Sequence, residues 1–301
     1  MKQMLFVMNP YAGMRKANKV LTEILEIFNR ADYLVHFYTT AASGDGERFV
    51  LEHAAGHDLV VCCGGDGTFN ETVSGILKSG LDIPVGYIPA GSTNDFASSL
   101  RLASDPVQAA RDIVAGEPER FDVGCFAGRY FSYVASFGAF TRASYATPQS
   151  VKNALGHTAY ILSGIQELSQ LKNEHVRLEL NDGTVIEDDF LFGAISNSTS
   201  VGGILTIAPD KVDMRDGKFE LLLVRAPRKL AEISECIQAL QKQTYNCSMV
   251  TFLSTESIRV FASEDMSWTL DGEFESGHSE AQVNNVHHAI QILRRRKELC
   301  S

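Results

Sequence analysis

A glycine-rich loop follows an apolar run near residue 64. The run Leu59–Cys63 reads as a buried strand, and Gly64-Gly65-Asp66-Gly67-Thr68-Phe69-Asn70-Glu71 comes directly after it. Glycines at 64, 65 and 67 permit positive φ angles and a close approach of backbone N–H groups to an anion. Asp66 would present its carboxylate to a magnesium ion beside that anion. The pattern favours a phosphate-binding loop where a strand ends.

The same segment also has a structural interpretation. Thr68 followed three residues later by Glu71 has the spacing of a capping box at the start of a helix. A capping box accounts for those two residues without a ligand. It does not account for an acid placed between glycines 65 and 67, so the phosphate loop is the preferred hypothesis.

Two other strand ends carry comparable turns. The apolar run 83–88 leads into Pro89-Ala90-Gly91-Ser92-Thr93-Asn94-Asp95, and the run Met4–Met8 ends in Asn9-Pro10-Tyr11-Ala12-Gly13. Open α/β sheets bind ligands at the carboxyl ends of their strands. Taken alone, Ser92 and Asp95 would also suit a helix N-terminus. Together the three loops predict one site along one sheet edge.

The chain reads in two parts. Residues 1 to about 123 alternate short apolar strands with helix-period segments at 16–29 and 107–114, which predicts a parallel sheet covered by helices. From Phe121 onward, strands joined by tight turns dominate, with turns expected at Gly128-Arg129 and Asp182-Gly183. Helix-like stretches interrupt this pattern near 150–172 and 228–243. We therefore expect an α/β domain followed by a β-rich domain.

Charge and hydropathy limit the classes of partner. The net charge of −10 argues against nucleic-acid binding and against broad affinity for anionic membranes. The first apolar run breaks at Asn9-Pro10, far short of a membrane span. Six cysteines without paired spacing suggest reduced thiols in a cytoplasm. The basic run Arg294–Lys297 either attracts a membrane surface or compensates a helix dipole.

With these motifs the chain resembles the soluble bacterial diacylglycerol kinase and lipid kinase family, whose catalytic domain eukaryotic diacylglycerol and sphingosine kinases share. The resemblance spans nearly the whole chain. Its other motifs are Thr40 before Gly44, Phe121-Asp122-Val123-Gly124, Asn197–Gly203 leading to Ala208-Pro209, Asp216-Gly217 and Leu270-Asp271-Gly272-Glu273. Ser92 stands where threonine is usual and keeps the hydroxyl. Ser98 replaces a common arginine, which puts a substrate contact from that position in doubt.

The resemblance implies an NAD kinase/diacylglycerol kinase-like fold. A nucleotide-binding α/β domain would comprise residues 1–123 plus a returning segment 289–301. A β-sandwich-like lipid substrate domain would comprise residues 124–288, with the active site in a cleft between the two.

The resemblance also assigns roles to residues. The implied nucleotide-binding positions are Asn9, Pro10, Tyr11, Ala12, Gly13, Thr40, Gly64, Gly65, Asp66, Gly67, Thr68, Phe69, Asn70 and Ser92. The implied ligands of a catalytic Mg²⁺ are Asp66, Asp95 and Asp122, and those of a structural Mg²⁺ are Asp216 with backbone groups near Asp213 and Lys218. Asp66 and Glu273 are the implied catalytic residues, with Glu273 as general base, although a β-turn acid would also fit Leu-Asp-Gly-Glu.

The leading functional hypothesis is an ATP-dependent kinase of a lipid hydroxyl, with diacylglycerol as the expected acceptor and Mg²⁺ as cofactor. An NAD kinase is the runner-up, because it shares a Gly-Gly-Asp-Gly loop. A catalytically silent lipid- or nucleotide-binding regulator is the third alternative. We expect a cytoplasmic protein that associates peripherally with membranes when active, and a homodimer is left open.

Overall fold

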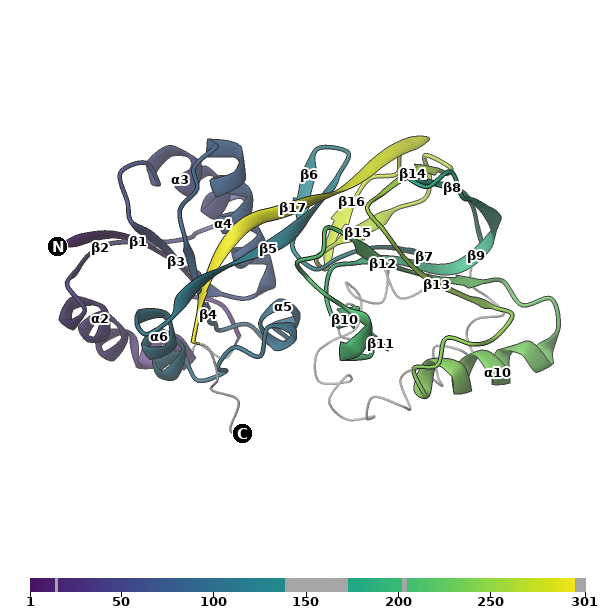
Figure 1. Ribbon diagram of the computed structural model, residues 1–301. Helices are drawn as coiled ribbons and strands as arrows, with labels where there is room; N and C mark the ends of the chain where they lie inside the picture. The colour runs from purple at the N-terminus through teal and green to yellow at the C-terminus, as the bar shows by residue number, and fades with distance from the viewer. Residues whose placement is uncertain (14–15, 139–172, 202–204, 296–301) are drawn as a thin grey trace. The chain divides into compact units, whose positions relative to one another are not determined.

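The computed structural model describes residues 1–13, 16–138, 173–201 and 205–295 (Figure 1). It divides into unit 1, Met1–Val123 with the segment that returns at His287, and unit 2, Gly124–Val286. Strands β5 (Glu117–Phe126) and β17 (Glu280–Arg294) continue from one unit into the other. Unit 1 therefore runs to residue 123, and its returning segment begins at His287.

Unit 1 is built on a parallel sheet in the spatial order β2-β1-β3-β4-β17. Its other strands are β1 (Lys2–Met8), β2 (Tyr33–Thr39), β3 (Leu59–Gly64) and β4 (Val85–Pro89). Its helices are α1 (Lys16–Lys19), α2 (Leu21–Arg30), α3 (Asp45–His53), α4 (Asp66–Ser79), α5 (Asp95–Ser99) and α6 (Pro106–Val114). Helices α2 and α6 pack together on one face of the sheet, and α3 and α4 pack together on the other (Figure 1).

Burial explains these elements. All six residues of β3 are buried, as a central parallel strand with helices on both faces requires. Helix α2 turns Ile24 and Phe28 into the core, and the Phe28 ring packs edge-on against Phe6 at 6.0 Å. Asp105 caps α6 by accepting the Gln108 N–H at 2.8 Å, ahead of proline at the first helical position.

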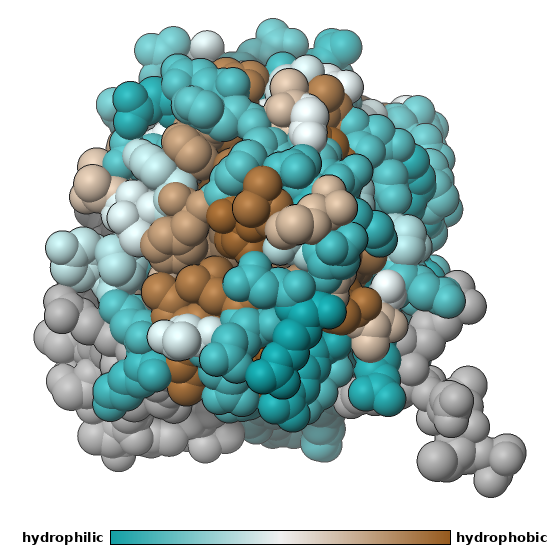
Figure 2. Space-filling model, turned by 90° about the vertical axis from the view of Figure 1, so that its left-hand side faces the viewer, coloured by the Kyte–Doolittle hydropathy of each residue, from teal (hydrophilic) through white to brown (hydrophobic). Residues whose placement is uncertain are grey.

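Strand β2 forms the edge of this sheet. It exposes two large apolar side chains, Leu34 and Phe37, at 43% and 41%, and Leu51 of α3 is exposed at 41%. Figure 2 shows the side of the molecule on which β2 lies in Figure 1. On this side an apolar patch is surrounded by hydrophilic residues. Contiguous exposed apolar surface of this kind is a feature of interaction sites.

Unit 2 consists mainly of antiparallel strands in the order β16-β15-β7-β9-β8-β14-β17, with β12 between β9 and β13. The strands are β6 (Arg129–Phe131), β7 (Val134–Gly138), β8 (Glu174–Leu180), β9 (Val185–Ser196), β10 (Ser200–Val201), β11 (Leu205–Thr206), β12 (Phe219–Arg225), β13 (Val250–Thr255), β14 (Ser257–Phe261), β15 (Trp268–Leu270) and β16 (Glu273–Glu275). A short 3₁₀ helix, η2 (Pro209–Lys211), and α10 (Leu230–Gln241) complete it. Trp268 lies in its core, with ring centroids 4.7 Å from Phe126 and 4.9 Å from Phe137.

The predicted fold class, a parallel-sheet α/β domain followed by a β-sandwich-like domain, is confirmed. The Asp182-Gly183 hairpin joins β8 to β9, and α10 lies inside the predicted helical stretch 228–243. The Gly128-Arg129 turn was placed one residue late, because Ala127 and Gly128 hold the positive φ angles and Phe126 pairs with Arg129. The predicted helix at 16–29 is divided at Val20 into α1 and α2. The stretch 150–172 lies outside the described residues. No helix within the described ranges is long and apolar enough to cross a membrane.

Candidate active site

The three predicted loops meet at the carboxyl edge of the unit 1 sheet. A Cβ atom on Gly91 would lie 2.6 Å from the Cα atom of Gly65, so the loops after β3 and β4 touch through their glycines. A Cβ atom on Gly13 would lie 2.4 Å from the carbonyl oxygen of Ala90, and Gly13 has a φ of +52°. The loop after β1 therefore reaches the same place. Side chains at Gly13 or Gly91 would fill this space, as expected for a cradle of backbone groups.

Asn9 connects the first loop to α4. Its side-chain Oδ1 accepts the Tyr11 N–H at 2.9 Å, which closes the turn, and its Nδ2 donates to Thr68 Oγ1 at 3.3 Å. The Thr40 N–H donates to the Met8 carbonyl at 2.9 Å, which brings the buried Thr40 beside the end of β1. Polar groups from four segments thus surround the start of α4.

Helix α4 begins at Asp66, with Gly65 as its N-cap, so the alternative with Thr68 as the cap of a capping box is wrong. Thr68 lies inside the helix. The carboxylate of Glu71 instead accepts the backbone N–H groups of Gly44 and Gly46, at 2.7 and 2.9 Å. Glu71 therefore fixes the start of α3, and α4 begins at the glycine loop without a side-chain cap.

Asp66 organises the third loop. Its two oxygens accept the backbone N–H groups of Asp95 at 2.9 Å and Phe96 at 3.2 Å, which fixes the N-terminus of α5. Burial, and secondarily the Asp95 carboxylate, raises the pKa of Asp66 to about 6, against the lowering effect of these hydrogen bonds. A carboxylate whose charge is disfavoured in this way suits a bound cation.

The other predicted nucleotide-binding residues differ in what they can offer. Phe69 is fully buried and stacks on Tyr87 and Phe96, at 4.4 and 4.7 Å between ring centroids, so its side chain belongs to the core. Ser92 is exposed, and Tyr11 is 67% exposed. Pro10, Ala12, Gly67 and Asn70 are partly buried around the same loops.

The three predicted catalytic metal ligands do not form one compact group. Asp95 is buried beside Asp66, whereas Asp122, on β5, accepts hydrogen bonds from His287 Nδ1 and the His288 N–H. Within the described residues, the only group of three ligand atoms lying within 4.8 Å of one another is Asp122 with His287 and His288. The oxygen-rich nest at Asp66 and Asp95 fits Mg²⁺, and Asp122 is held elsewhere by two donors.

His287 and His288 depart from regular strand geometry. Adjacent residues of a regular strand point to opposite faces. In the structure His288 has a φ of +53°, and the two rings stack 3.7 Å apart. The irregular backbone turns both imidazoles to the same side.

The predicted structural metal site lies in a tight turn of unit 2. The Lys218 N–H donates to Asp216 Oδ1 at 2.9 Å, Gly217 has a φ of +78°, and the carbonyl of Lys218 accepts the Asn285 side-chain amide at 3.0 Å. Asp213, Asp216 and Lys218 are all exposed.

Glu220 lies just beyond this turn, on β12, and is only 1% exposed. Its Oε2 atom is buried, and no group in the described part of the chain hydrogen-bonds to it. Burial, with Asp216 as the next cause, raises the pKa of Glu220 to about 8. A cation near Asp216 would satisfy this oxygen, so the residues present fit the implied metal.

Glu273 begins β16 in unit 2 and is accessible. Its side chain is 47% exposed and forms an ion pair with Arg129 at 3.3 Å. The turn before it is held by Asp271, whose buried carboxylate accepts the N–H groups of Ser132, Tyr133 and Val134. Because Asp271 and Gly272, both at positive φ, make the turn, the turn itself does not require an acid at position 273.

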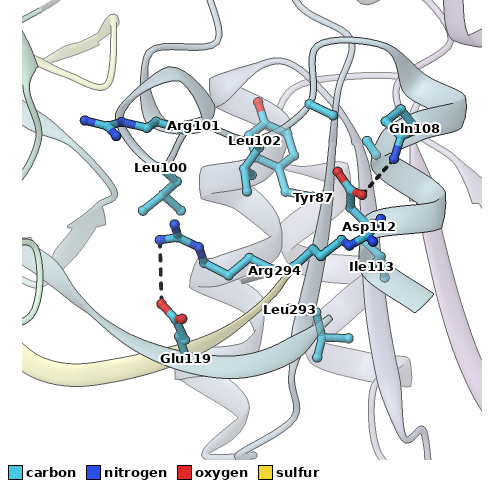
Figure 3. A pocket seen from close by; sticks show the side chains of 13 residues that line it. Tyr87, Leu100, Arg101, Leu102, Gln108, Asp112, Ile113, Glu119, Leu293 and Arg294 are labelled. Carbon is cyan, nitrogen blue, oxygen red and sulfur yellow. Dashed lines mark hydrogen bonds and ion pairs between the residues drawn. The ribbon is translucent and has the colours of Figure 1, made fainter. Parts of the chain in front are cut away.

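A separate pocket of about 860 Å³ lies in unit 1 (Figure 3). Apolar side chains such as Leu100, Leu102 and Ile113 form part of its wall, and Arg294 crosses it toward Glu119, 3.6 Å away. None of the predicted site residues lines it. Arg294, part of the basic run, is thus engaged in an ion pair instead of standing free for a membrane surface.

Residue patterns did not predict the partners of several of these groups. Glu71, Asp271 and Arg129 contact residues far away in the chain. Glu220 alone carried a recognisable sign, since an acid inside the apolar segment Phe219–Val224 must be buried if the segment is a central strand.

Comparisons with known proteins assign the chain to a family. Residues 3–126 match the model of the diacylglycerol kinase catalytic domain, and residues 134–294 match the YegS C-terminal NAD kinase beta sandwich-like domain. A protein named diacylglycerol kinase from Bacillus subtilis is 30% identical over 97% of this chain and 96% of its own length. One from Staphylococcus epidermidis is 32% identical over 97% and 92%.

A solved structure described as a diacylglycerol kinase from Bacillus anthracis superposes with a TM-score of 0.81 at 23% identity, covering 98% of this chain and 95% of that one. This likeness shows a shared fold. The matching catalytic and C-terminal domains, and relatives that are similar from end to end, show that the chain is a lipid kinase of the diacylglycerol kinase family.

Proposed function

We propose that this protein transfers the γ-phosphoryl group of ATP to the hydroxyl group of diacylglycerol, giving phosphatidic acid. The observation that carries the proposal is the meeting of three strand-end loops around the start of α4, with Asp66 between them. Phosphoryl transfer requires held phosphates, a divalent metal and an oriented hydroxyl more than covalent chemistry by the protein. The loops supply the first of these needs.

The nucleotide phosphates would contact the N–H groups of the glycine loop 64–67 and of the Asn9–Gly13 turn, with Thr40 and Ser92 offering hydroxyl groups. Backbone donors at a helix N-terminus favour negative charge and need no rearrangement when the phosphates arrive. The close contact of Gly65 with Gly91 supports this role, because side chains at these positions would occupy the cradle.

Asp66 and Asp95 would hold the catalytic Mg²⁺. When bound, this ion neutralises charge on the phosphate oxygens during transfer. Asp66 is oriented for the role by the N–H groups of Asp95 and Phe96. Asp216 would hold a second, structural Mg²⁺ with carbonyl groups near Asp213 and Lys218.

Glu273 would act as general base. Its carboxylate accepts the proton of the lipid hydroxyl while the hydroxyl oxygen forms a bond to the γ-phosphorus and the bond from that phosphorus to the β-phosphate oxygen breaks, releasing ADP. Its exposure leaves it open to a substrate, and Arg129 pairs with its carboxylate at 3.3 Å.

An NAD kinase is the second candidate, favoured by the NAD kinase beta sandwich-like description of the C-terminal domain. The two kinases differ in the acceptor, a nucleotide hydroxyl instead of a lipid hydroxyl. A silent regulator, the third alternative, would bind nucleotide without transferring phosphate.

The test is transfer of radiolabelled γ-phosphate from ATP to a panel of diacylglycerol, monoacylglycerol, sphingosine, undecaprenol and NAD, with and without Mg²⁺. We expect Mg²⁺-dependent labelling of diacylglycerol above the other acceptors. Labelling of NAD alone would establish the second candidate. Nucleotide binding without labelling of any acceptor would favour the regulator.

Association with membranes is proposed for the active state, because the acceptor resides in a bilayer. Co-sedimentation of the full chain with diacylglycerol-containing vesicles tests it, and equal recovery in the supernatant with and without vesicles would contradict it.

A further inference from the structure

Asp122, His287 and His288 form a cluster that the proposed kinase reaction does not use as a unit. Asp122 lies on β5 and the histidines on β17, and these two strands pair with each other. One carboxylate oxygen and one nitrogen from each imidazole lie within 4.8 Å of one another. The carboxylate is fully buried, whereas the His287 side chain is 52% exposed, so the cluster opens to solvent on its histidine side.

Backbone geometry creates the cluster. The positive φ of His288 is rare for a residue other than glycine, and a regular strand would have separated the two rings. Here the rings stack with an angle of 24° between their planes. The His288 N–H donates to Asp122 Oδ1 at 2.7 Å, which holds this irregular backbone in place. Strained backbone conformations of this kind gather at functional sites.

The contact between His287 and Asp122 marks a place for a cation. His287 Nδ1 and Asp122 Oδ1 lie 3.0 Å apart, so an ion that replaces the proton between them would contact both atoms. Metal binding to imidazole and carboxylate groups releases protons in this way.

We propose that His287 and His288, with Asp122, bind a transition-metal ion of the Zn²⁺ class. Imidazole nitrogen suits Zn²⁺, Cu²⁺ and Ni²⁺, while Mg²⁺ prefers oxygen and keeps its waters. Zn²⁺ sites in proteins are tetrahedral with Zn–N bonds of about 2.0–2.1 Å, so two ligand atoms of one ion stand about 3.4 Å apart. His287 Nδ1 and Asp122 Oδ1 are 3.0 Å apart, and all three ligand atoms lie within 4.8 Å of one another. The exposed histidine side chains can turn to close the remaining difference.

The ion would connect β5 and β17 within unit 1. Metal binding at this cluster does not rest on the proposed function.

The experiment is calorimetric titration of the full chain with Zn²⁺, after treatment with chelator and in the absence of nucleotide and lipid. We expect about one tight equivalent that excess Mg²⁺ does not displace. The test variant is His287→Gln/His288→Asn, in which asparagine tolerates the positive φ. It should lose this equivalent. Asp122→Asn should weaken binding by about 10- to 100-fold.

The matched control is His36→Gln/His57→Gln, which removes another pair of contacting histidines. His36 Nδ1 and His57 Nε2 lie 2.7 Å apart, and within the described residues no carboxylate joins them to form a group of three ligands. It should keep the tight equivalent. Thermal melting verifies that each variant is folded, and Co²⁺ spectra report imidazole ligation directly. Undiminished binding by the His287/His288 variant, or displacement of Zn²⁺ by Mg²⁺, would overturn the proposal.

Discussion

Replacing Glu220 with glutamine tests the second cation site through stability alone. Burial sets the pKa of Glu220 to about 8 in the folded protein without metal, against an ordinary value of 4.5. Between these pH values the native state holds a proton that the unfolded chain has released. The free energy of unfolding of the metal-free wild type must therefore fall as pH rises through this window.

The size of the effect follows from the two pKa values. At 1.36 kcal/mol per pH unit, the metal-free wild type should lose up to about 5 kcal/mol between pH 4.5 and pH 8 through this one group. The glutamine variant has no proton to release and should show a flatter dependence. The stability of the variant relative to the wild type should therefore increase as pH rises.

Magnesium should raise the free energy of unfolding of the wild type and so oppose its loss at high pH. An ion that binds only the folded state stabilises by about 2.7 kcal/mol at 100 times its dissociation constant. The wild type should gain such stability at pH 8, whereas Glu220→Gln and Asp216→Ala should gain little. Glu235→Gln, which removes an exposed acid on α10, is the matched control and should respond like the wild type.

The assay is urea denaturation from pH 5 to pH 9, in chelator and in Mg²⁺. Parallel pH profiles for the wild type and Glu220→Gln would refute the claim that burial raises the pKa of Glu220. Equal stabilisation of both proteins by Mg²⁺ would refute the claim that Glu220 helps to bind a cation.

Three other perturbations follow from particular contacts. Asp66→Asn should abolish most phosphoryl transfer. It should also lower the melting temperature by the equivalent of about 1–3 kcal/mol, because an amide nitrogen cannot accept a hydrogen bond from the Asp95 or Phe96 N–H. Turnover near the wild-type rate would remove Asp66 from the site. Glu232→Gln should lower the melting temperature at pH 7, because a hydrogen bond from Arg225 lowers the pKa of Glu232 to about 2. That contribution is present above the ordinary value of 4.5 and is lost as pH falls through about 2, so melting curves that stay equally far apart at pH 2 and pH 7 would contradict it. Phe37→Glu, on the exposed edge strand β2, should shift sedimentation toward the monomer if a homodimer forms there; an unchanged mass that remains dimeric would place the dimer contact elsewhere.

The arrangement of unit 1 was predictable because its signals are local. Buried strands such as β3 are apolar throughout, and the loops that follow them are rich in glycine, so parallel topology alone brings the loops together. Asp105-Pro106 and Asp182-Gly183 likewise marked a helix start and a hairpin through the chemistry of one or two residues.

What the sequence did not reveal depends on distant partners. Glu71 has the spacing of a capping box, and only the fold shows that α3 supplies its donors. The alternation rule failed at His287 and His288, because a single positive φ cancels it. Asp66 was expected to face a magnesium ion and a nucleotide, and the structure adds that its oxygens accept backbone N–H groups 29 and 30 residues away. Such contacts have no pattern in the nearby sequence.

Single-turnover transfer of γ-phosphate from ATP to diacylglycerol by the Glu273→Gln variant tests the central claim most directly. Glu275→Gln is the matched control, since Glu275 lies on the same strand and pairs with the same arginine. We predict that Glu273→Gln lowers the transfer rate by about 10²- to 10⁴-fold while calorimetry finds nucleotide affinity nearly unchanged, and that Glu275→Gln transfers at close to the wild-type rate. Transfer by Glu273→Gln at the wild-type rate would show that the proton goes to another group and would contradict the proposed active site.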